Sequence, residues 1–181
     1  LRHTIIPLLA LAGATAAQAR TPDPSLARQE GVLQWVDTRI GTSGHGNFMG
    51  AAAPFGAVQL GPNNFNKGWD WCSGYHYSDS ILIGFSHTHL SGTGCTDLGD
   101  ILIMPLNEIR TPRGNQDDIR DGYASKYSHD NEIARPEYYS LILDRYNIKA
   151  ELTATDRVGF HRYTYPEGKP ASILILSLIH I

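Results

Sequence analysis

The sequence predicts an all-β domain of the β-sandwich class. Short runs alternate apolar and polar residues with a period of two, and no long run shows the period of an amphipathic helix. Gly (18) and Pro (10) are plentiful, which favours short strands joined by turns. At 181 residues, with 41% hydrophobic and 18% charged residues, the chain can bury one core. Its formal charge of -3 lacks the basic excess that a nucleic-acid partner requires.

The clearest strands are predicted in the C-terminal half. Residues 138–143 and 148–155 alternate apolar and polar side chains, as half-buried strands do. Residues 144–147 are the expected hairpin connection between them, and residues 158–165 repeat the alternation. Three such neighbours predict an antiparallel meander.

Shorter apolar runs are predicted to be strands upstream of the meander. Residues 57–60, 81–85 and 101–104 are bounded by Gly, Pro or Asp and suit central strands of a sandwich. Residues 173–176 have the character of a buried strand. No internal repeat accompanies them.

The N-terminal residues are typical of an export signal. An apolar stretch at residues 5–14 is followed by Ala-Gln-Ala at 17–19, the small-x-small pattern that precedes signal-peptidase cleavage. We therefore expect a signal peptide at 1–19 and a Pro-containing linker at 20–31. The apolar stretch is shorter than the roughly 20 residues of a membrane span. The sequence predicts a secreted, periplasmic or cell-surface protein with no transmembrane span.

The remaining residues are expected to belong to one domain that is a piece of a longer protein. We assign residues 32–176 to the β-sandwich, because the predicted strand at 173–176 stands at its far end. Residues 177–181 resemble translated adapter sequence, so we expect a non-native tail there.

Residues 68–77 combine two Trp and two Tyr with polar side chains in one loop. A sugar ring needs this chemistry, because its C–H groups stack on flat aromatic faces while its hydroxyls take polar partners. The alternative is that these aromatics form the core beneath a long loop. The residues alone leave both interpretations open.

A second chemical cluster follows the strand predicted at 81–85. His87 and His89 are two positions apart, so on a strand they share a face and, with Asp97 and Asp100, could ligate a metal. A metal hydrolase built on the two histidines is one hypothesis, although structural histidines are commoner.

Two other features of this region remain undecided by the sequence. Cys72 and Cys95 could form a disulfide in an exported chain, or remain buried or site-lining thiols. The glycine-rich loop at 41–47 lacks the Lys-Ser/Thr ending of a phosphate-binding Walker A loop. Its glycines are expected to let the backbone approach a ligand or another domain closely.

Several ordered motifs together resemble the N-terminal domain of glycoside hydrolase family 92. They lie at residues 40–47, 54–56, 69–79, 84–95, 148–155 and 158–163. The resemblance implies an exported, calcium-dependent, exo-acting α-mannosidase that inverts anomeric configuration. It also implies that the β-sandwich packs on an (α/α)6 barrel and that α-mannoside glycans are the substrates.

The resemblance implies that the reacting groups lie outside this chain. In the family the acid, the base and the Ca2+ ligands come mainly from the barrel, so neither catalytic residues nor metal ligands are assigned here. The chain alone is expected to be inactive, with its own C-terminal catalytic domain as its partner. The alternative is a free-standing β-sandwich carbohydrate-binding module.

The resemblance also assigns residues that would border the terminal mannose or the sugar beneath it. These are Phe55, Gly56, Trp69, Asp70, Trp71, Cys72 and His87. Stacking by Trp69 or Trp71 is the leading expectation, and Asp70 would contact hydroxyls or brace its loop. Phe48-Met49 departs from the family's usual Thr-Phe-Pro, which leaves the shape of that loop open.

Overall fold

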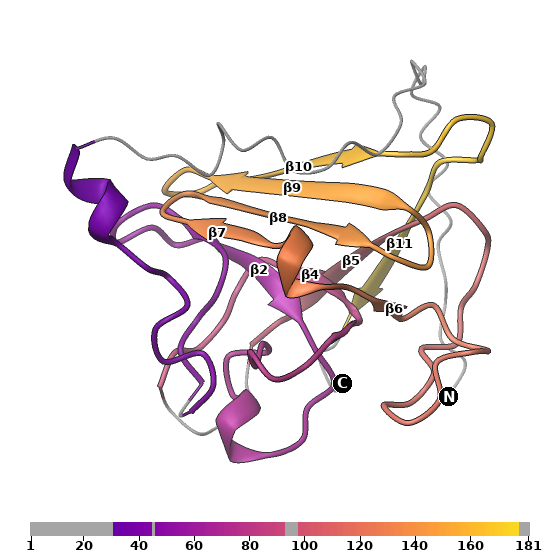
Figure 1. Cartoon of the computed structure of the whole chain (residues 1–181), viewed down its shortest axis with the longest axis horizontal. Helices are drawn as coiled ribbons and strands as arrows, with labels where there is room; N and C mark the ends of the chain where they lie inside the picture. Colours follow the sequence, from indigo (N-terminus) through magenta and orange to yellow (C-terminus); the bar gives the residue numbers. More distant parts are fainter. Residues whose placement is uncertain (1–30, 45, 93–97, 178–181) are drawn as a thin grey trace.

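A computed structural model describes residues 31–44, 46–92 and 98–177 of the chain. They form two antiparallel β-sheets that face one another, with a small two-stranded sheet beside them (Figure 1). The predicted β-sandwich is confirmed. The predicted signal peptide, most of the linker, and tail residues 178–181 lie outside the described residues.

The first sheet has five strands, and every neighbouring pair is antiparallel. In spatial order the strands are β1 (Ala51–Ala52), β2 (Gln59–Asn63), β4 (Gly84–Ser86), β5 (Ile101–Leu106) and β11 (Ser172–Ser177). Strand β11 therefore joins a strand about 70 positions earlier in the sequence and forms an edge of the sheet. The predicted runs at 101–104 and 173–176 both lie within strands.

The second sheet contains the predicted meander. Its spatial order is β10 (Gly159–Thr164), β9 (Ile148–Ala154), β8 (Tyr138–Leu143) and β7 (Ile133–Arg135). The amide of Tyr146 donates to the carbonyl of Leu143 at 3.2 Å in the predicted turn, and Asn147 takes a positive φ of 49°. Strand β7 was not predicted.

The run predicted as one strand at 81–85 is divided between two sheets. Residues β3 (Ile81–Leu82) pair with β6 (Ser125–Lys126), whereas β4 belongs to the five-stranded sheet. Gly84 follows the break with a φ of 145°, and a Cβ there would lie 2.7 Å from Leu102 Cγ. Glycine thus allows both the unusual backbone and the close approach of β5.

Helical structure within the described ranges is limited to three short 3-10 turns. They are η1 (Gly31–Trp35), η2 (Trp69–Trp71) and η3 (His129–Asn131). The hydroxyl of Ser128 accepts from the amide of Asp130 at 3.2 Å and caps η3. The short η2 turn carries both tryptophans of the predicted aromatic loop.

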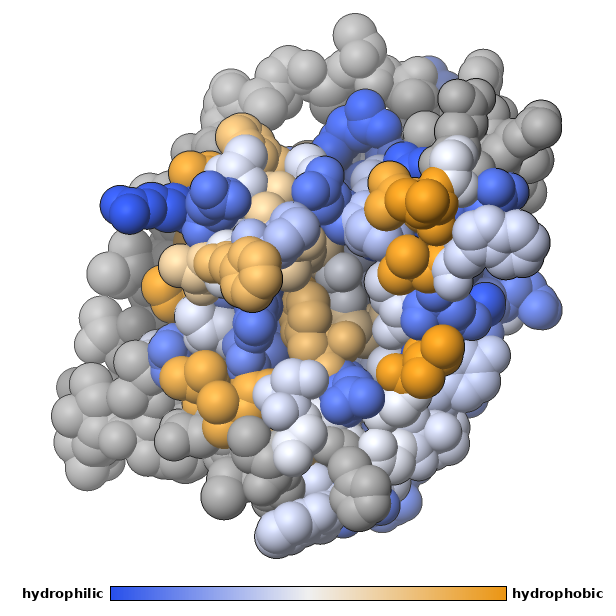
Figure 2. All heavy atoms as spheres, turned by 90° about the vertical axis from the view of Figure 1, so that its left-hand side faces the viewer, coloured by the Kyte–Doolittle hydropathy of each residue, from blue (hydrophilic) through white to orange (hydrophobic). Residues whose placement is uncertain are grey.

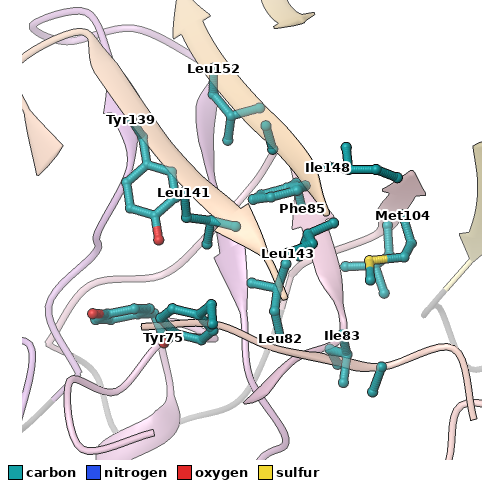
Figure 3. Close-up of a cluster of buried hydrophobic side chains, with 14 of the residues drawn as sticks. Tyr75, Leu82, Ile83, Phe85, Met104, Tyr139, Leu141, Leu143, Ile148 and Leu152 are labelled. Atoms are coloured by element: carbon teal, nitrogen blue, oxygen red, sulfur yellow. The ribbon is translucent and has the colours of Figure 1, made fainter. Parts of the chain in front are cut away.

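The hydrophobic core lies between the sheets and extends under the loop at 68–79. Figure 3 shows Phe85 and Met104 from one sheet close to Leu143 and Ile148 from the other, with Tyr75 contributed by the loop. Burying each of these side chains contributes about 2 kcal/mol. The core therefore anchors the aromatic loop to a rigid scaffold.

Candidate carbohydrate-binding site

The aromatic loop at 68–79 is fixed to its neighbours by polar contacts. The amide of Asn64 donates to the carbonyl of Gly74 at 2.6 Å, and the Asn64 side chain accepts from the amide of His76 at 2.9 Å. The hydroxyl of Ser73 donates to the carbonyl of Asn47 at 3.1 Å. These bonds hold the loop against the end of β2 and against the glycine-rich loop at 41–47.

Trp71 is locked into the protein by three neighbours. Its indole Nε1 donates to Asp79 Oδ2 at 2.5 Å, and Asp79 also forms an ion pair with Lys67. The imidazole of His76 stacks on the indole with ring centroids 4.0 Å apart and an interplanar angle of 14°. The Lys67 ammonium lies 5.6 Å from the ring centroid. One face of this indole is therefore already covered by protein.

Trp69 has a different environment, although it is only two positions away. Its side chain is 63% exposed at the first position of η2, after Gly68 has taken a positive φ of 125°. Asp70, between the two tryptophans, is half-buried. Of the two indoles, Trp69 is the one that presents its ring to solvent.

Cys72 packs beneath the glycine-rich loop. Its thiol is 3% exposed and donates to the carbonyl of Gly46 at 3.6 Å. Gly46 takes a φ of 57°, and a Cβ there would overlap the sulfur. Cys95, the other half of the disulfide considered above, lies outside the described residues. The contact with Gly46 shows why the loop needs a glycine at this point.

Phe55 occupies a strained turn on the surface. The amide of Gly56 donates to the carbonyl of Ala53 at 3.0 Å, and Phe55 has a φ of 61°, which normally favours glycine. The side chain is fully exposed, with a relative accessibility of 108%. The amide of Ala57 donates to the carbonyl of Asp156 at 2.7 Å, so the turn is fixed to the β9–β10 connection. A strained residue that displays an aromatic ring suggests a binding role.

His87 forms a bond between the segment after β4 and strand β10. Its Nε2 lies 3.1 Å from Nε2 of His161, whose Nδ1 lies 2.6 Å from the hydroxyl of Tyr163. Burial, with a smaller contribution from the His87 charge, lowers the pKa of His161 to about 4. In this contact one ring nitrogen donates and the other accepts. Gly159 lies close against His87. A Cβ at position 159 would lie 3.0 Å from the His87 ring, so glycine allows this close approach.

His89 is a buried structural histidine. Its Nδ1 lies 2.7 Å from the carbonyl of Gln59, and its Nε2 lies 2.9 Å from Ser86 Oγ and 3.1 Å from Asn63 Oδ1. Burial lowers its pKa to about 4. Because both ring nitrogens have protein partners, the metal-hydrolase hypothesis gains no support from this residue.

The described residues also lack a site that suits a metal ion. Among them, no group of three or more His, Cys, Asp or Glu side chains is arranged to hold one. The hydroxyl of Thr88 donates to Asp100 at 3.4 Å, whereas Asp97 lies outside the described residues. The described residues therefore do not fit a calcium site.

Sequence reasoning missed a buried carboxylate that supports the aromatic loop. The side chain of Glu132 is 2% exposed and accepts from Tyr75 at 3.1 Å, Tyr139 at 2.5 Å and His129 Nδ1 at 2.6 Å. Burial, followed by the Glu132 charge, raises the pKa of Tyr75 and of Tyr139. The ring of His129 in turn stacks on Tyr77, with centroids 4.3 Å apart. His129 and Tyr139 are close to Glu132 in the sequence, but Tyr75 lies 57 positions away, so the link to the aromatic loop could not be predicted from a local motif.

Comparison with known proteins assigns this fold and its loops to a family. Residues 35–180 match the family model of the Glycosyl hydrolase family 92 N-terminal domain. The chain belongs to glycoside hydrolase family 92. The resemblance predicted from the sequence motifs is thereby confirmed, and the chain is related to hydrolases that act on glycosidic bonds.

Solved family 92 structures share the fold. The α-mannosidase BT3965 from Bacteroides thetaiotaomicron, in complex with mannoimidazole, is 44% identical, with a TM-score of 0.77 over 81% of this chain and 20% of that one. The inverting mannosidase BT2199 from Bacteroides thetaiotaomicron VPI-5482 is 25% identical, with a TM-score of 0.63 over 81% of this chain and 20% of that one.

A curated relative points to the same class of enzyme. An uncharacterized secreted glycosidase from Arthroderma benhamiae is 30% identical over 158 residues, which are 81% of this chain and 19% of the relative. The family 92 chain described here thus spans about a fifth of the length of these relatives. No helix among its described residues is long and apolar enough to cross a bilayer.

Proposed function

We propose that this chain is the N-terminal part of an exported, exo-acting, inverting α-mannosidase that removes terminal α-linked mannose from glycans. Family 92 membership supports the proposal, and of the similar solved structures one is described as an α-mannosidase and another as an inverting mannosidase. The curated relative is called secreted, which supports export. The chain spans about a fifth of these relatives, so the activity belongs to the longer polypeptide.

The observation that carries the proposal is an exposed aromatic on a fixed loop. Trp69 is 63% exposed, while Trp71 two positions away is held by Asp79 and His76. A rigid support lowers the entropic cost of presenting a ring to a sugar. In the proposed enzyme Trp69 stacks on the terminal mannose or on the sugar beneath it, and Phe55 borders the same pocket. Asp70, Cys72 and His87 remain predicted pocket residues.

The acid and base of the proposed reaction are assigned to the rest of the polypeptide. An inverting glycosidase needs one carboxylic acid at the leaving oxygen and one carboxylate at the attacking water, about 6.5–9.5 Å apart. Near the aromatic loop, Asp79 is engaged by Trp71 and Lys67, and Glu132 accepts three hydrogen bonds within the core. The chain's own residues therefore bind and orient the sugar, and calcium is expected in the domain that supplies the acid and base.

An apolar surface at one end of the sandwich supports a partner domain. We use the name apolar end surface for the exposed apolar side chains of two regions: η1 with the residues that follow it (Val32, Leu33, Trp35, Val36 and Ile40), and the Phe55 turn with the β9–β10 connection (Phe55 and Val158), which the hydrogen bond from Ala57 to Asp156 joins. Figure 2 shows apolar side chains, in orange, gathered around a hollow on the face that carries η1. Exposed apolar area of this kind marks interaction sites. In the proposed enzyme this surface packs against the C-terminal catalytic domain.

The test is expression of the whole reading frame with calcium, followed by an assay on α-linked mannobioses. Mannose should be released from the non-reducing end, and NMR should detect the β-anomer first. Trp69→Ala should lower kcat/KM by about fivefold or more, because a lost aromatic stacking contact is worth roughly 1 kcal/mol beyond its area. The proposal is wrong if the wild-type protein releases no mannose.

A free-standing carbohydrate-binding module is the second candidate, and the exposure of Trp69 favours it. Titration of the 181-residue chain with methyl α-mannoside by calorimetry separates the two functions. Saturable binding that Trp69→Ala abolishes would support the module. If the chain shows no heat of binding, it supplies only part of a pocket.

A further inference from the structure

Strand β10 carries two polar side chains that face the inside of the sandwich. His161 and Tyr163 are two positions apart, so they lie on the same face of the strand. The ring of Tyr163 packs against Phe85 of the five-stranded sheet, with centroids 6.3 Å apart. The ring of His161 lies against that of His87, with centroids 4.9 Å apart. One sheet thus reaches across to a predicted pocket residue that follows a strand of the other.

Three polar groups form a chain of hydrogen bonds at this place. The Tyr163 hydroxyl lies 2.6 Å from Nδ1 of His161, and Nε2 of His161 lies 3.1 Å from Nε2 of His87. Nδ1 of His87 ends the chain, because it is buried and has no hydrogen-bond partner among the described residues. The chain therefore runs from the core to one unpaired nitrogen.

Burial keeps the first two groups of this chain uncharged. It is the largest cause of the lowered pKa of His161, about 4, and it raises the pKa of Tyr163. At neutral pH the hydroxyl therefore keeps its proton, and His161 is a neutral ring. A neutral imidazole has one N–H and one acceptor nitrogen, so the hydrogen bond at one nitrogen of His161 determines the role of the other.

The chain can run in two directions, which leave different groups unpaired. If the hydroxyl donates to Nδ1 of His161, then Nε2–H of His161 donates to His87, and the Nδ1–H of His87 is the one group without a partner. In the reverse direction the hydrogen of Tyr163 and Nδ1 of His87 are both unpaired, because His161 is the hydroxyl's one partner among the described residues. Buried polar groups without a partner are costly, so the first direction is favoured.

We propose that Tyr163 and His161 are positioning residues for the sugar pocket, which hold the ring of His87 with its proton on Nδ1 as a hydrogen-bond donor to the sugar. The proposal rests on the proposed function, in which His87 borders the sugar. A buried donor that the protein leaves unpaired requires an acceptor from a ligand or from water. In the proposed enzyme a sugar oxygen accepts from this Nδ1–H, directly or through one bridging water.

A neighbouring histidine provides an internal standard for the position of the proton. Nδ1 of His89 lies 2.7 Å from the carbonyl of Gln59, and a carbonyl only accepts, so this nitrogen carries the hydrogen. Burial lowers the pKa of His89 to about 4, so its ring is neutral at neutral pH. His89 is therefore a reference for the Nδ1–H tautomer within the same chain.

The first test is NMR of the ring nitrogens at neutral pH, in the 181-residue chain labelled with heavy nitrogen at histidine. Protonated and unprotonated ring nitrogens have distinct chemical shifts. His87 should match His89, with its proton on Nδ1, whereas His161 should carry its proton on Nε2. The signals lost in His87→Gln and in His161→Gln assign the two rings. A proton on Nε2 of His87, with or without a second one on Nδ1, would overturn the proposal.

Removal of one hydroxyl should change the tautomer of His87. Tyr163→Phe leaves Nδ1 of His161 without a donor, so His87 should no longer be held in the Nδ1–H form, while unchanged His89 signals report an intact fold. Tyr165→Phe is the matched control, because the Tyr165 hydroxyl donates to the carbonyl of Ser172 at 2.8 Å and forms no hydrogen bond with either ring. An unchanged His87 spectrum in Tyr163→Phe would overturn the role given to Tyr163.

The second test measures the sugar pocket in the full-length enzyme. Tyr163→Phe and His161→Leu should raise KM for an α-linked mannobiose by about three- to tenfold with kcat nearly unchanged, because the lost hydrogen bond is made to bound substrate and transition state alike. His161→Gln keeps an N–H donor and should restore much of the affinity, and Tyr165→Phe should leave KM unchanged. A loss of folded protein alone lowers kcat and not KM. An unchanged KM in Tyr163→Phe and His161→Leu would overturn the positioning role.

Failure of the proposed function would give a different result. A full-length enzyme that releases no mannose contradicts the proposed activity, whereas the NMR spectra still decide the direction of the hydrogen-bond chain. An enzyme that releases mannose with an unchanged KM in Tyr163→Phe contradicts the positioning role alone.

Discussion

Phe55 combines a strained backbone with a fully exposed ring. Its φ of 61° costs a non-glycine residue about 1 kcal/mol, and the exposed ring recovers little of this by burial. Phe55→Gly should therefore leave the free energy of unfolding unchanged or raise it by up to about 1 kcal/mol. In the full-length enzyme the same variant should weaken substrate binding. Urea unfolding and KM measure the two effects, and a clear loss of stability would show that the ring has a structural role.

Substitution of the two tryptophans of η2 should lower the stability of the fold to different extents. Trp71→Ala removes an indole packed on His76 and a hydrogen bond to Asp79, so we expect a loss of about 2–4 kcal/mol in the free energy of unfolding. Trp69→Ala removes an exposed ring and should cost less than about 1 kcal/mol. Denaturant unfolding of both variants checks this. Similar losses for the two would contradict the environments described above.

The sequence could nominate these residues but could not distinguish their roles. The aromatic loop is recognisable from its composition, and both tryptophans carry the same chemistry. Their difference arises because Asp79 and His76 fold back onto Trp71 and not onto Trp69. Such contacts depend on the path of the loop between β2 and β3, which no local spacing encodes. For the same reason Glu132 was missed.

At the level of the elements, His89 and His161 connect segments of the fold while their imidazole rings are neutral. Burial is the largest cause of a pKa lowered to about 4 for both His89 and His161. The unfolded chain, with histidine pKa values near 6.5, binds more protons than the native protein between these values. The free energy of unfolding should therefore fall as the pH is lowered from about 6.5 to 4, by at most about 3 kcal/mol for the buried His89.

Unfolding in urea at several pH values measures this dependence. His161→Asn should flatten the slope between pH 6.5 and 4.5, because it removes one of the two titrating groups. The low pKa of Glu151, about 2, does not interfere. Its hydrogen bonds from Arg162 lower that pKa against the opposing effect of burial, so its contribution is lost only below about pH 4.5. A free energy of unfolding that does not change between pH 6.5 and 4.5 would contradict the lowered pKa values of His89 and His161.

Arg145 stabilises the segment before β6 through its planar guanidinium. It donates to the carbonyls of Ile119, Arg120, Gly122 and Ala124 at 2.6, 2.6, 2.7 and 3.0 Å. A lysine has fewer donors and no planar fork, so Arg145→Lys should lower the free energy of unfolding by about 1–3 kcal/mol. Thermal or urea unfolding checks it, with Arg157→Lys, at an exposed position, as the control. An unchanged midpoint of unfolding for Arg145→Lys would show that hydrogen bonds from water replace those of Arg145 without loss of stability.

The strands with a clear alternation were predictable, and those without one were not. Strand β8 lies where the pattern at 138–143 predicts it, because Tyr139, Leu141 and Leu143 are buried on one face, whereas Tyr138 and Ile142 on the other face are half-buried. The run at 81–85 is apolar throughout, so its division between two sheets at Ile83 depends on the close approach of β5 to Gly84. Strand β7 is three half-buried residues long, and its pairing with β8 comes from tertiary contact.

At the scale of the whole molecule, the apolar end surface is the part of the described residues that suits the proposed partner domain. The apolar end surface is built from η1, the Phe55 turn and the β9–β10 connection, none of which offers a free strand edge. It suits the side of a packed domain. The sequence predicted such a partner from the family resemblance but could not locate the surface, since its residues are scattered along the chain.

A substitution on the apolar end surface tests whether this surface packs against the catalytic domain. Ile40 is exposed on it, so Ile40→Lys should leave the unfolding of the 181-residue chain unchanged within about 0.5 kcal/mol. In the full-length enzyme the proposed packing would bury the same lysine against the catalytic domain without a partner charge. Its desolvation should lower the unfolding midpoint and reduce kcat/KM by about tenfold or more. Unchanged kinetics, together with an unchanged midpoint, would place the catalytic domain on another surface of the sandwich.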